Sequence, residues 1–367
     1  MKTTHRLVTG DARFAQFEAE SVGLVITSPP YPMIAMWDDA FSEMTLASKE
    51  ALFSNNGQLA WELMHKELDI VWASLFKALI NGGIACINIG DATRTIDGTF
   101  RLYPNAARII DGMSKAGFTP LPDIIWRKPT NAPNKFMGSG MLPAGAYVTY
   151  EHEYILIFRK GNKRAFSTEA EKQNRRRSAY FWEERNRWFS DIWQNISGTH
   201  QLLTSESVRN RSGAFPFTVP MRLIQMYSVY GDTVLDPFVG TGTTMAAAVA
   251  SGRSSIGVDV DPGLHPKIDE YIKLGAEASG EISQRRIKAH MASTEERLAN
   301  SGDSKHNNES YGFPVVTTQE RLLELPASAS IESSPDESTD ERVWKIEHVI
   351  GTAHDLIDQE KLTAKGA

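Results

Sequence analysis

Short apolar runs that end in turn residues or charged residues recur along the first 160 positions of the chain. Between them, apolar residues take helical spacing over 68–80 and again over 105–115, and glycines follow both stretches. Strands that alternate with helices predict an α/β fold with a mainly parallel sheet. The predicted strands of this half are Leu24–Ile26, Ile84–Ile89, Ile124–Trp126 and Tyr154–Phe158.

This alternation breaks over 161–212, which is rich in arginine, asparagine, tryptophan and serine and has no clear periodicity. It returns with a predicted helix over 220–230, a strand over 233–235, a helix over 245–250 and a strand over 255–260. Beyond residue 298 the chain is polar and acidic, and 327–340 is predicted as a flexible linker, with weak signs of structure over 343–356. We therefore expect one catalytic domain in two halves, 1–160 and 213–298, an insert at 161–212, and an acidic, partly flexible extension at 299–367.

The net charge of −6 is unevenly distributed along the chain. Residues 291–367 hold 15 acidic and 7 basic residues, a net of −8, which leaves +2 on residues 1–290. Within that part, residues 159–187 hold ten basic and four acidic residues. A concentrated basic segment of this kind is typical of a surface that contacts nucleic-acid phosphates.

Composition excludes several other classes of protein. No apolar run approaches the roughly 18 residues of a membrane span, and the amino terminus has no apolar signal core, so we expect a cytoplasmic protein. Cys86 is the only cysteine, which excludes internal disulfides and cysteine-rich metal sites. It stands in an apolar run and is interpreted as a small buried hydrophobe. His152 is likewise interpreted as structural, and no spaced cluster of ligating residues indicates a metal.

A glycine-rich turn between a predicted strand and a predicted helix is the first candidate site. Glycines let a backbone lie against a ligand, and the helix start offers free amides and hydroxyls to a carboxylate. Asp259, at the end of the next strand, stands 17 residues beyond Gly242, a spacing suited to ribose hydroxyls. Met245 replaces the third glycine of a dinucleotide fingerprint, and an acid before the glycines suits an ammonium group. The residues of this turn are Asp236, Phe238, Gly240, Gly242, Thr243 and Thr244.

A second candidate site is Ser28-Pro29-Pro30-Tyr31, at the carboxyl end of the first predicted strand. Pro29 and Pro30 fix the backbone and remove two amide donors, so that the Ser28 hydroxyl and the Pro29 carbonyl are left as acceptors. Such acceptors suit a planar amino group with two N–H donors, and Tyr31 offers a flat face to an extruded base.

Taken with these motifs, the chain resembles the amino-methylating DNA methyltransferases, and the order of its motifs is that of their β class. The resemblance covers roughly residues 5–275. It implies a Rossmann-like fold dependent on S-adenosylmethionine, with the methionine and adenosine parts lined by Asp236 and Phe238, the ribose at Asp259 and the adenine near Asp11. It also implies that Ser28 with the Pro29 carbonyl orients the target amine, that Tyr31 stacks on the base, and that the substrate is double-stranded DNA.

Within this family, Ser in the first motif position is mostly associated with N4 of cytosine, so we expect a cytosine-N4 methyltransferase. Methylation at carbon 5 of cytosine needs a thiolate, and it is disfavoured because the chain has no Pro-Cys nucleophile. N6-adenine methylation on the same scaffold stays open, as do an RNA or protein-glutamine methyltransferase and a regulator without catalysis. A cognate restriction endonuclease is an expected partner, and the choice between monomer and homodimer stays open.

Target recognition is expected from the insert, whose arginines alternate with aromatic residues. A second loop, residues 131–142, is also expected to face DNA. The predicted DNA-binding residues are Lys135, Arg175, Arg176, Arg177, Arg185 and Arg187.

Overall fold

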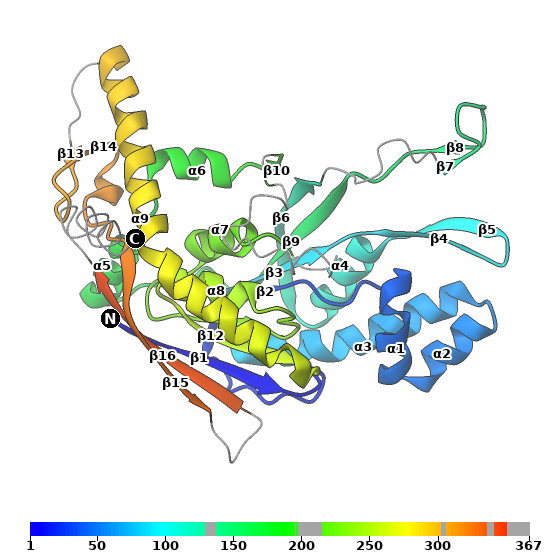
Figure 1. Ribbon diagram of the computed structural model, residues 1–367. Coiled ribbons are helices and arrows are strands. Elements are labelled where there is room, and N and C mark those ends of the chain that lie inside the picture. The colour runs from blue at the N-terminus through cyan, green and yellow to red at the C-terminus, as the bar shows by residue number, and fades with distance from the viewer. Residues whose placement is uncertain (129–136, 195, 197–214, 302–305, 336–340, 351–367) are drawn as a thin grey trace, which may run out of the picture.

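The computed structural model describes residues 1–128, 137–194, 196, 215–301, 306–335 and 341–350, and its centre is a ten-stranded sheet (Figure 1). The strand order is β10-β6-β9-β3-β2-β11-β12-β1-β16-β15. Three two-stranded hairpins, β4–β5, β7–β8 and β13–β14, lie outside it. The strands are β1 Lys2–Thr9, β2 Val22–Thr27, β3 Leu79–Ile89, β4 Ala92–Ile96, β5 Thr99–Tyr103, β6 Phe118–Arg127, β7 Met137–Gly138, β8 Ala146–Tyr147, β9 His152–Lys160, β10 Ile192–Trp193, β11 Thr233–Asp236, β12 Ser254–Asp259, β13 His306–Asn307, β14 Pro314–Val315, β15 Pro326–Pro335 and β16 Glu341–Ile350.

The five central strands β3, β2, β11, β12 and β1 are all parallel. Their carboxyl ends therefore meet at one edge of the sheet, here called the carboxyl edge, and their starts form the amino edge. β9 and the pair β16–β15 flank this block in antiparallel pairing. The prediction of a mainly parallel α/β sheet is confirmed, although β9, which was expected as one more alternating strand, runs against its neighbours.

Successive strand residues point to opposite sides of the sheet, and here both sides carry buried apolar residues. Helices therefore cover both faces. Val25 and Ile87 pack with α3 and α4 on one face, whereas Leu24 and Cys86 pack with α7 and α8 on the other. Cys86 is fully buried, and burial raises the pKa of its thiol, as its interpretation as a core residue requires. The helices are α1 Asp38–Met44, α2 Leu46–Phe53, α3 Gly57–Ala78, α4 Asn105–Lys115, α5 Glu169–Arg177, α6 Trp182–Trp188, α7 Thr218–Tyr227, α8 Thr243–Ala250 and α9 His265–Ser301.

The prediction of a flexible linker over 327–340 is wrong for its first part, because residues 326–335 form the edge strand β15. β15 pairs with β16, which pairs with β1, so the extension completes the main sheet. In β16, Trp344, Ile346 and His348 alternate with exposed residues and are buried. β15 is serine-rich with few buried side chains, so its composition resembles that of a linker while the pairing with β16 orders it.

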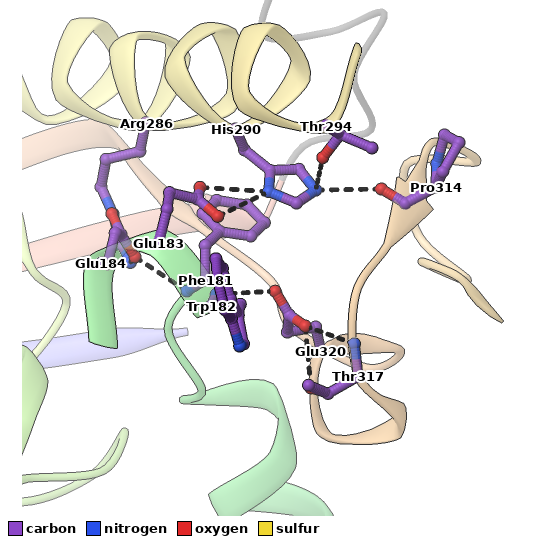
Figure 2. A network of polar contacts seen from close by, with 10 residues as sticks. All are labelled: Phe181, Trp182, Glu183, Glu184, Arg286, His290, Thr294, Pro314, Thr317 and Glu320. Atoms are coloured by element: carbon purple, nitrogen blue, oxygen red, sulfur yellow. Dashed lines mark hydrogen bonds and ion pairs between the residues drawn. The ribbon is translucent and has the colours of Figure 1, made fainter. Parts of the chain in front are cut away.

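Figure 2 shows how the insert is fixed to the extension through α9, a 37-residue helix that the periodicity of the sequence did not indicate. Arg286 of α9 binds Glu184 of α6 through two hydrogen bonds of 2.7 and 2.8 Å, and both side chains are buried. His290 Nδ1 lies 3.1 Å from Glu183, and its Nε2 lies 3.0 Å from the Pro314 carbonyl. Burial opposes protonation, but these two acceptors raise the pKa of His290 above its ordinary value.

Glu320 completes this joint, because its carboxylate accepts from the Trp182 amide at 2.8 Å and from the Thr317 amide at 2.7 Å (Figure 2). One atom each of Glu183, His290 and Glu320 lies within 4.8 Å of the others, a spacing that a metal could use. Each of the three side chains already has protein partners, so the hydrogen bonds account for the arrangement.

None of the helices in the described part of the chain combines the length and the apolar composition of a membrane span.

Candidate functional site

A buried carboxylate joins the two halves of the candidate site at the carboxyl edge. Thr27 ends β2 and Asp236 ends the adjacent strand β11, although 209 residues separate them. The Thr27 hydroxyl donates to Asp236 Oδ1 at 2.7 Å, and the Thr244 hydroxyl donates to Oδ2 at 2.6 Å. The Phe238 amide adds a third hydrogen bond, to Oδ1 at 3.1 Å. Ser28, the residue after Thr27, is thereby held beside the glycine-rich turn.

Burial raises the pKa of Asp236 to about 6, although the hydrogen bonds from Thr244, Thr27 and Phe238 act in the opposite direction. The carboxylate is therefore ionised at neutral pH while only 2% of the residue is exposed. Its position before the glycines predicts that this charge faces a cationic ligand. In the structure both oxygens also hold the turn and the start of α8, so Asp236 has a structural function that its position in the sequence did not reveal.

The glycine-rich turn needs glycine at two positions. Gly240 and Gly242 have φ values of 54° and 88°, which residues with a Cβ rarely adopt. The Gly240 amide donates to Asp259 Oδ2 at 2.9 Å, which ties the turn to the end of β12. Thr243 Oγ1 lies 3.4 Å from Thr241 Oγ1, so both hydroxyls of the helix start, Thr243 and Thr244, have intramolecular partners.

Gly257 explains why a methionine follows the turn where a dinucleotide-binding fold has glycine. A Cβ at Gly257 would lie 2.6 Å from Met245 Sδ and 2.9 Å from Val239 Cγ2. The glycine in β12 therefore provides the room in which Met245 packs. In this contact the small residue, Gly257, belongs to the strand, so the helix residue can be the large Met245.

Asp11 lies at the same edge, in the loop after β1. The Gly10 amide donates to the Asp259 carbonyl at 2.8 Å, and β1 pairs in parallel with β12. The Asp11 carboxylate is held by Arg13, at 2.5 Å, and Arg13 also binds Glu67. Burial opposes ionisation, but the bonds and charge of Arg13 lower the pKa of Asp11. The predicted cofactor residues of β1, β11 and β12 thus meet at one place.

A chain of hydrogen bonds connects the catalytic motif to a carboxylate on β9. Ser28 Oγ donates to the Tyr31 hydroxyl at 3.1 Å, which donates to Glu153 Oε2 at 3.0 Å. Asn88 Nδ2 donates to the same hydroxyl at 2.7 Å and to Glu153 Oε2 at 2.8 Å. Lys128 Nζ binds Glu153 Oε1 at 2.6 Å. Burial and the charge of Glu153 raise the pKa of Tyr31 well above its ordinary value, so its phenol keeps its proton.

Asn88, Lys128 and Glu153 were not selected from the sequence. Asn88 interrupts the apolar run of β3, and Glu153 stands where β9 begins, so each is a polar residue in an otherwise apolar strand. That pattern could have drawn attention to both, but their convergence on Tyr31 depends on the antiparallel pairing of β3 and β9. Asn88 Oδ1 is buried and has no hydrogen-bond partner among the described residues, which leaves one acceptor beside Ser28. His152 packs between Tyr150 and Tyr154, with ring centroids 5.3 and 4.9 Å away.

Comparison with known proteins gives consistent matches over most of the chain. The family model described as DNA methylase, of N6/N4 methyltransferases, matches residues 22–270. The Type II methyltransferase M.MthZI of Methanothermobacter thermautotrophicus is 49% identical over 327 residues, 89% of this chain and 91% of that protein. M.MjaI of Methanocaldococcus jannaschii, another Type II methyltransferase, is 49% identical over 297 residues, 78% of this chain and 94% of its own length.

The chain belongs to the DNA methylase family. The resemblance seen in its motifs is therefore confirmed. A Thermus thermophilus protein solved in complex with S-adenosyl-L-methionine is 33% identical, with a TM-score of 0.56 over 74% of this chain and 96% of its own. PvuII DNA methyltransferase, cytosine-N4-specific, shares the fold, with a TM-score of 0.52 at 18% identity over 73% of this chain and 92% of its own.

The arginines that were predicted to bind DNA do not gather near Ser28 in this DNA methylase. α5 packs at the amino edge, because Asn174 binds the Tyr230 carbonyl at 2.6 Å and Arg164 binds Asp232 at 2.7 Å, both just before β11. Figure 1 shows α5 at the left, beside the N-terminus, and the hairpins β4–β5 and β7–β8 at the right. Arg177 forms an ion pair with Glu324 of the extension, and Arg187 is exposed on α6. Lys135 lies outside the described residues, and the other three predicted DNA contacts, Arg175, Arg176 and Arg185, line a groove at the amino edge.

The raised pKa of Asp236 predicts a specific dependence of stability on pH. The ordinary value is 3.8 and the value in the fold is about 6, so between these pH values the folded protein holds a proton that the unfolded chain releases. The free energy of unfolding should therefore fall as pH rises from about 4 to about 6, by at most about 3 kcal/mol, and stay level above. Asp236→Asn should abolish this decline in thermal unfolding followed by circular dichroism. The exposed Asp39→Asn should keep it, and a decline of equal size in Asp236→Asn would exclude Asp236 as its source.

Proposed function

We propose that this DNA methylase transfers a methyl group from S-adenosylmethionine to N4 of cytosine in duplex DNA, after the base has left the helix. The observation that carries the proposal is the chain Ser28–Tyr31–Glu153. It is anchored one residue from the Thr27–Asp236 contact that joins the catalytic motif to the glycine-rich turn. A methyl donor in the turn and an amine at Ser28 would be neighbours in this arrangement.

The direction of the hydrogen bonds suits Ser28 to an amine. Its proton is directed to the Tyr31 oxygen, and Asn88 Nδ2 contacts Ser28 Oγ only at 3.5 Å, so one lone pair of Ser28 Oγ is left to accept an N–H of the target. The Pro29 carbonyl would take the second N–H. As the amine gains the methyl group it must lose a proton, which Ser28 can accept while its own proton passes to Tyr31 and that of Tyr31 to Glu153. Asn88 and Lys128 hold Glu153 in position for this step.

The residues at the turn fit S-adenosylmethionine, which supplies an electrophilic methyl group when bound. A Cβ built at Gly240 meets no heavy atom within 4 Å, so open space lies over the turn. Asp236 provides negative charge toward a cationic ligand, Asp259 would accept ribose hydroxyls, and Asp11 lies on the adenine side. Phe238, half-buried in the turn, would contact the adenosine.

The proposed substrate follows from DNA methylase membership, and the choice of cytosine rests on Ser28 as the acceptor in place of a carboxylate. N6-adenine is the second candidate, since the same hydroxyl chain would also orient an adenine amine. The names of M.MthZI and M.MjaI as Type II methyltransferases support a protective function beside a restriction endonuclease.

We also propose residues 161–212 as the unit inserted between the two halves of the catalytic domain.

The chemical product separates these candidates. Unmethylated duplex DNA is incubated with the protein and methyl-labelled S-adenosylmethionine, digested, and its nucleosides are separated by chromatography. We expect the label in N4-methylcytosine and none in 5-methylcytosine. Label in N6-methyladenine alone would contradict the cytosine assignment but keep the mechanism. Label in RNA or protein but in no duplex would overturn the proposal, as would cofactor binding without any turnover.

Glu153 should affect chemistry and leave cofactor affinity unchanged. Glu153→Gln removes the carboxylate that ends the proton path, and we expect a loss of at least about 100-fold in kcat. Glu151→Gln is the matched control, because Glu151 lies two residues away, half exposed and paired with Arg127. Asp259→Ala should instead act on cofactor affinity: the Kd for S-adenosylmethionine, measured by calorimetry, should rise. If Glu153→Gln and wild type have equal kcat, Glu153 is not part of the proton path.

A further inference from the structure

A basic groove lies at the amino edge of the sheet, the edge opposite Ser28. It has a volume of about 1110 Å³ and is bounded by the start of β3, the end of β9, α5, the residues after α7 and residues 317–322 of the extension. Eight cationic side chains line it, against two acidic ones. In a chain whose net charge is −6, this is a strong local reversal of charge.

Several cations of this groove are not neutralised by the protein. Arg159, Lys163, Arg175 and Arg185 have no carboxylate within ion-pair distance among the described residues. Arg176 and Lys172 reach only the exposed Glu169, at 3.7 and 3.9 Å, and such surface pairs contribute little. The two acids are engaged, because Glu309 pairs with Arg321 at 2.8 Å and Glu320 is buried in the joint with α6.

The groove is also a built surface. Two of its walls come from the insert and the extension, which the buried pair Glu184–Arg286 and the contacts of His290 and Glu320 fix to each other (Figure 2). Aromatic rings hold the arginines in place: the Arg175 guanidinium lies 4.8 Å from the centre of the Phe166 ring, and that of Arg185 lies 4.3 Å from the centre of Phe189. Guanidinium groups placed in this way are preorganised for phosphate.

We propose that the basic groove binds the phosphate backbone of a second segment of duplex DNA, distinct from the segment that carries the target base. The charge of the groove selects a polyanion, and the DNA methylase already works on DNA. The target segment lies elsewhere, because Ile84 at the groove and Ile89 at the carboxyl edge are five strand residues apart, roughly 17 Å. Because the groove lies at the opposite edge, a duplex bound across the carboxyl edge would have to bend around the sheet to reach it.

The second contact has a functional consequence for long DNA. A protein held at one segment through the groove keeps its active site near other segments of the same molecule, which raises the effective concentration of target sites. Duplex DNA is stiff over about 150 base pairs, so only DNA well beyond that length returns easily to the same protein. The inference requires a DNA substrate but not the assignment to N4 of cytosine.

The test compares Arg175→Gln/Arg176→Gln with wild type. The matched control is Lys66→Gln/Lys115→Gln, which removes the same charge from exposed positions on α3 and α4. Total methyl incorporation is measured on a plasmid and on a 14-base-pair duplex with the same recognition site. We expect the arginine variant to lose about tenfold in kcat/KM on the plasmid at low salt, with the short duplex and the control variant within twofold of wild type.

A binding measurement, which needs no turnover, accompanies the kinetics. The affinity for a 30-base-pair duplex without the recognition site is followed by fluorescence anisotropy as salt is raised. The slope of log K against log salt should fall by about two in the arginine variant and by less than one in the control. Equal losses on plasmid and short duplex would mean that these arginines contact the target segment. An unchanged slope, or preferential competition by structured RNA or an acidic protein, would also overturn the proposal.

Discussion

The fold of this DNA methylase depends on one buried carboxylate. Asp236 ends β11 beside Thr27 at the end of β2, and it accepts hydroxyl protons from Thr27 and Thr244. An unpaired carboxylate in this position would be very costly, so the two hydroxyls and the Phe238 amide stabilise the fold here. Because Ser28 directly follows Thr27, the same contact fixes the distance between the catalytic motif and the glycine-rich turn. Residues far apart in the sequence thereby become one site.

Much of this arrangement could be predicted from the sequence, because local patterns encode it. The apolar runs gave the central strands, and the motifs at their ends gave Ser28, Asp236 and Asp259. The parts that were missed depend on pairing across long separations. The convergence of Asn88 and Glu153 on Tyr31 requires β9 to run antiparallel to β3, and no local pattern indicates that direction. β15 was interpreted as a linker since its order comes from β16, and not from a buried face of its own.

The two edges of the sheet have different chemistry. Acceptors and carboxylates gather at the carboxyl edge, where an amine and a cationic donor would meet. Uncompensated arginines gather at the amino edge, in a groove that the insert and the extension form together. The charge count of the sequence correctly identified a basic segment but could not tell which edge it faces. That depends on contacts such as Asn174 with the Tyr230 carbonyl, which turn α5 away from the catalytic motif.

The most direct test of this account is the behaviour of Thr27→Val, which keeps the shape of the side chain and removes the donor to Asp236. Single-turnover methyl transfer is measured at saturating S-adenosylmethionine, together with the Kd of the cofactor, and Thr27→Ser serves as the variant that restores the hydroxyl. The account predicts that Thr27→Val weakens cofactor binding and slows transfer, each by about fivefold or more, the effect of about 1–3 kcal/mol for a lost partner of a buried polar group. Thr27→Ser should recover most of both. A Thr27→Val protein with both quantities within twofold of wild type would contradict the claim that this contact holds the two halves of the site together.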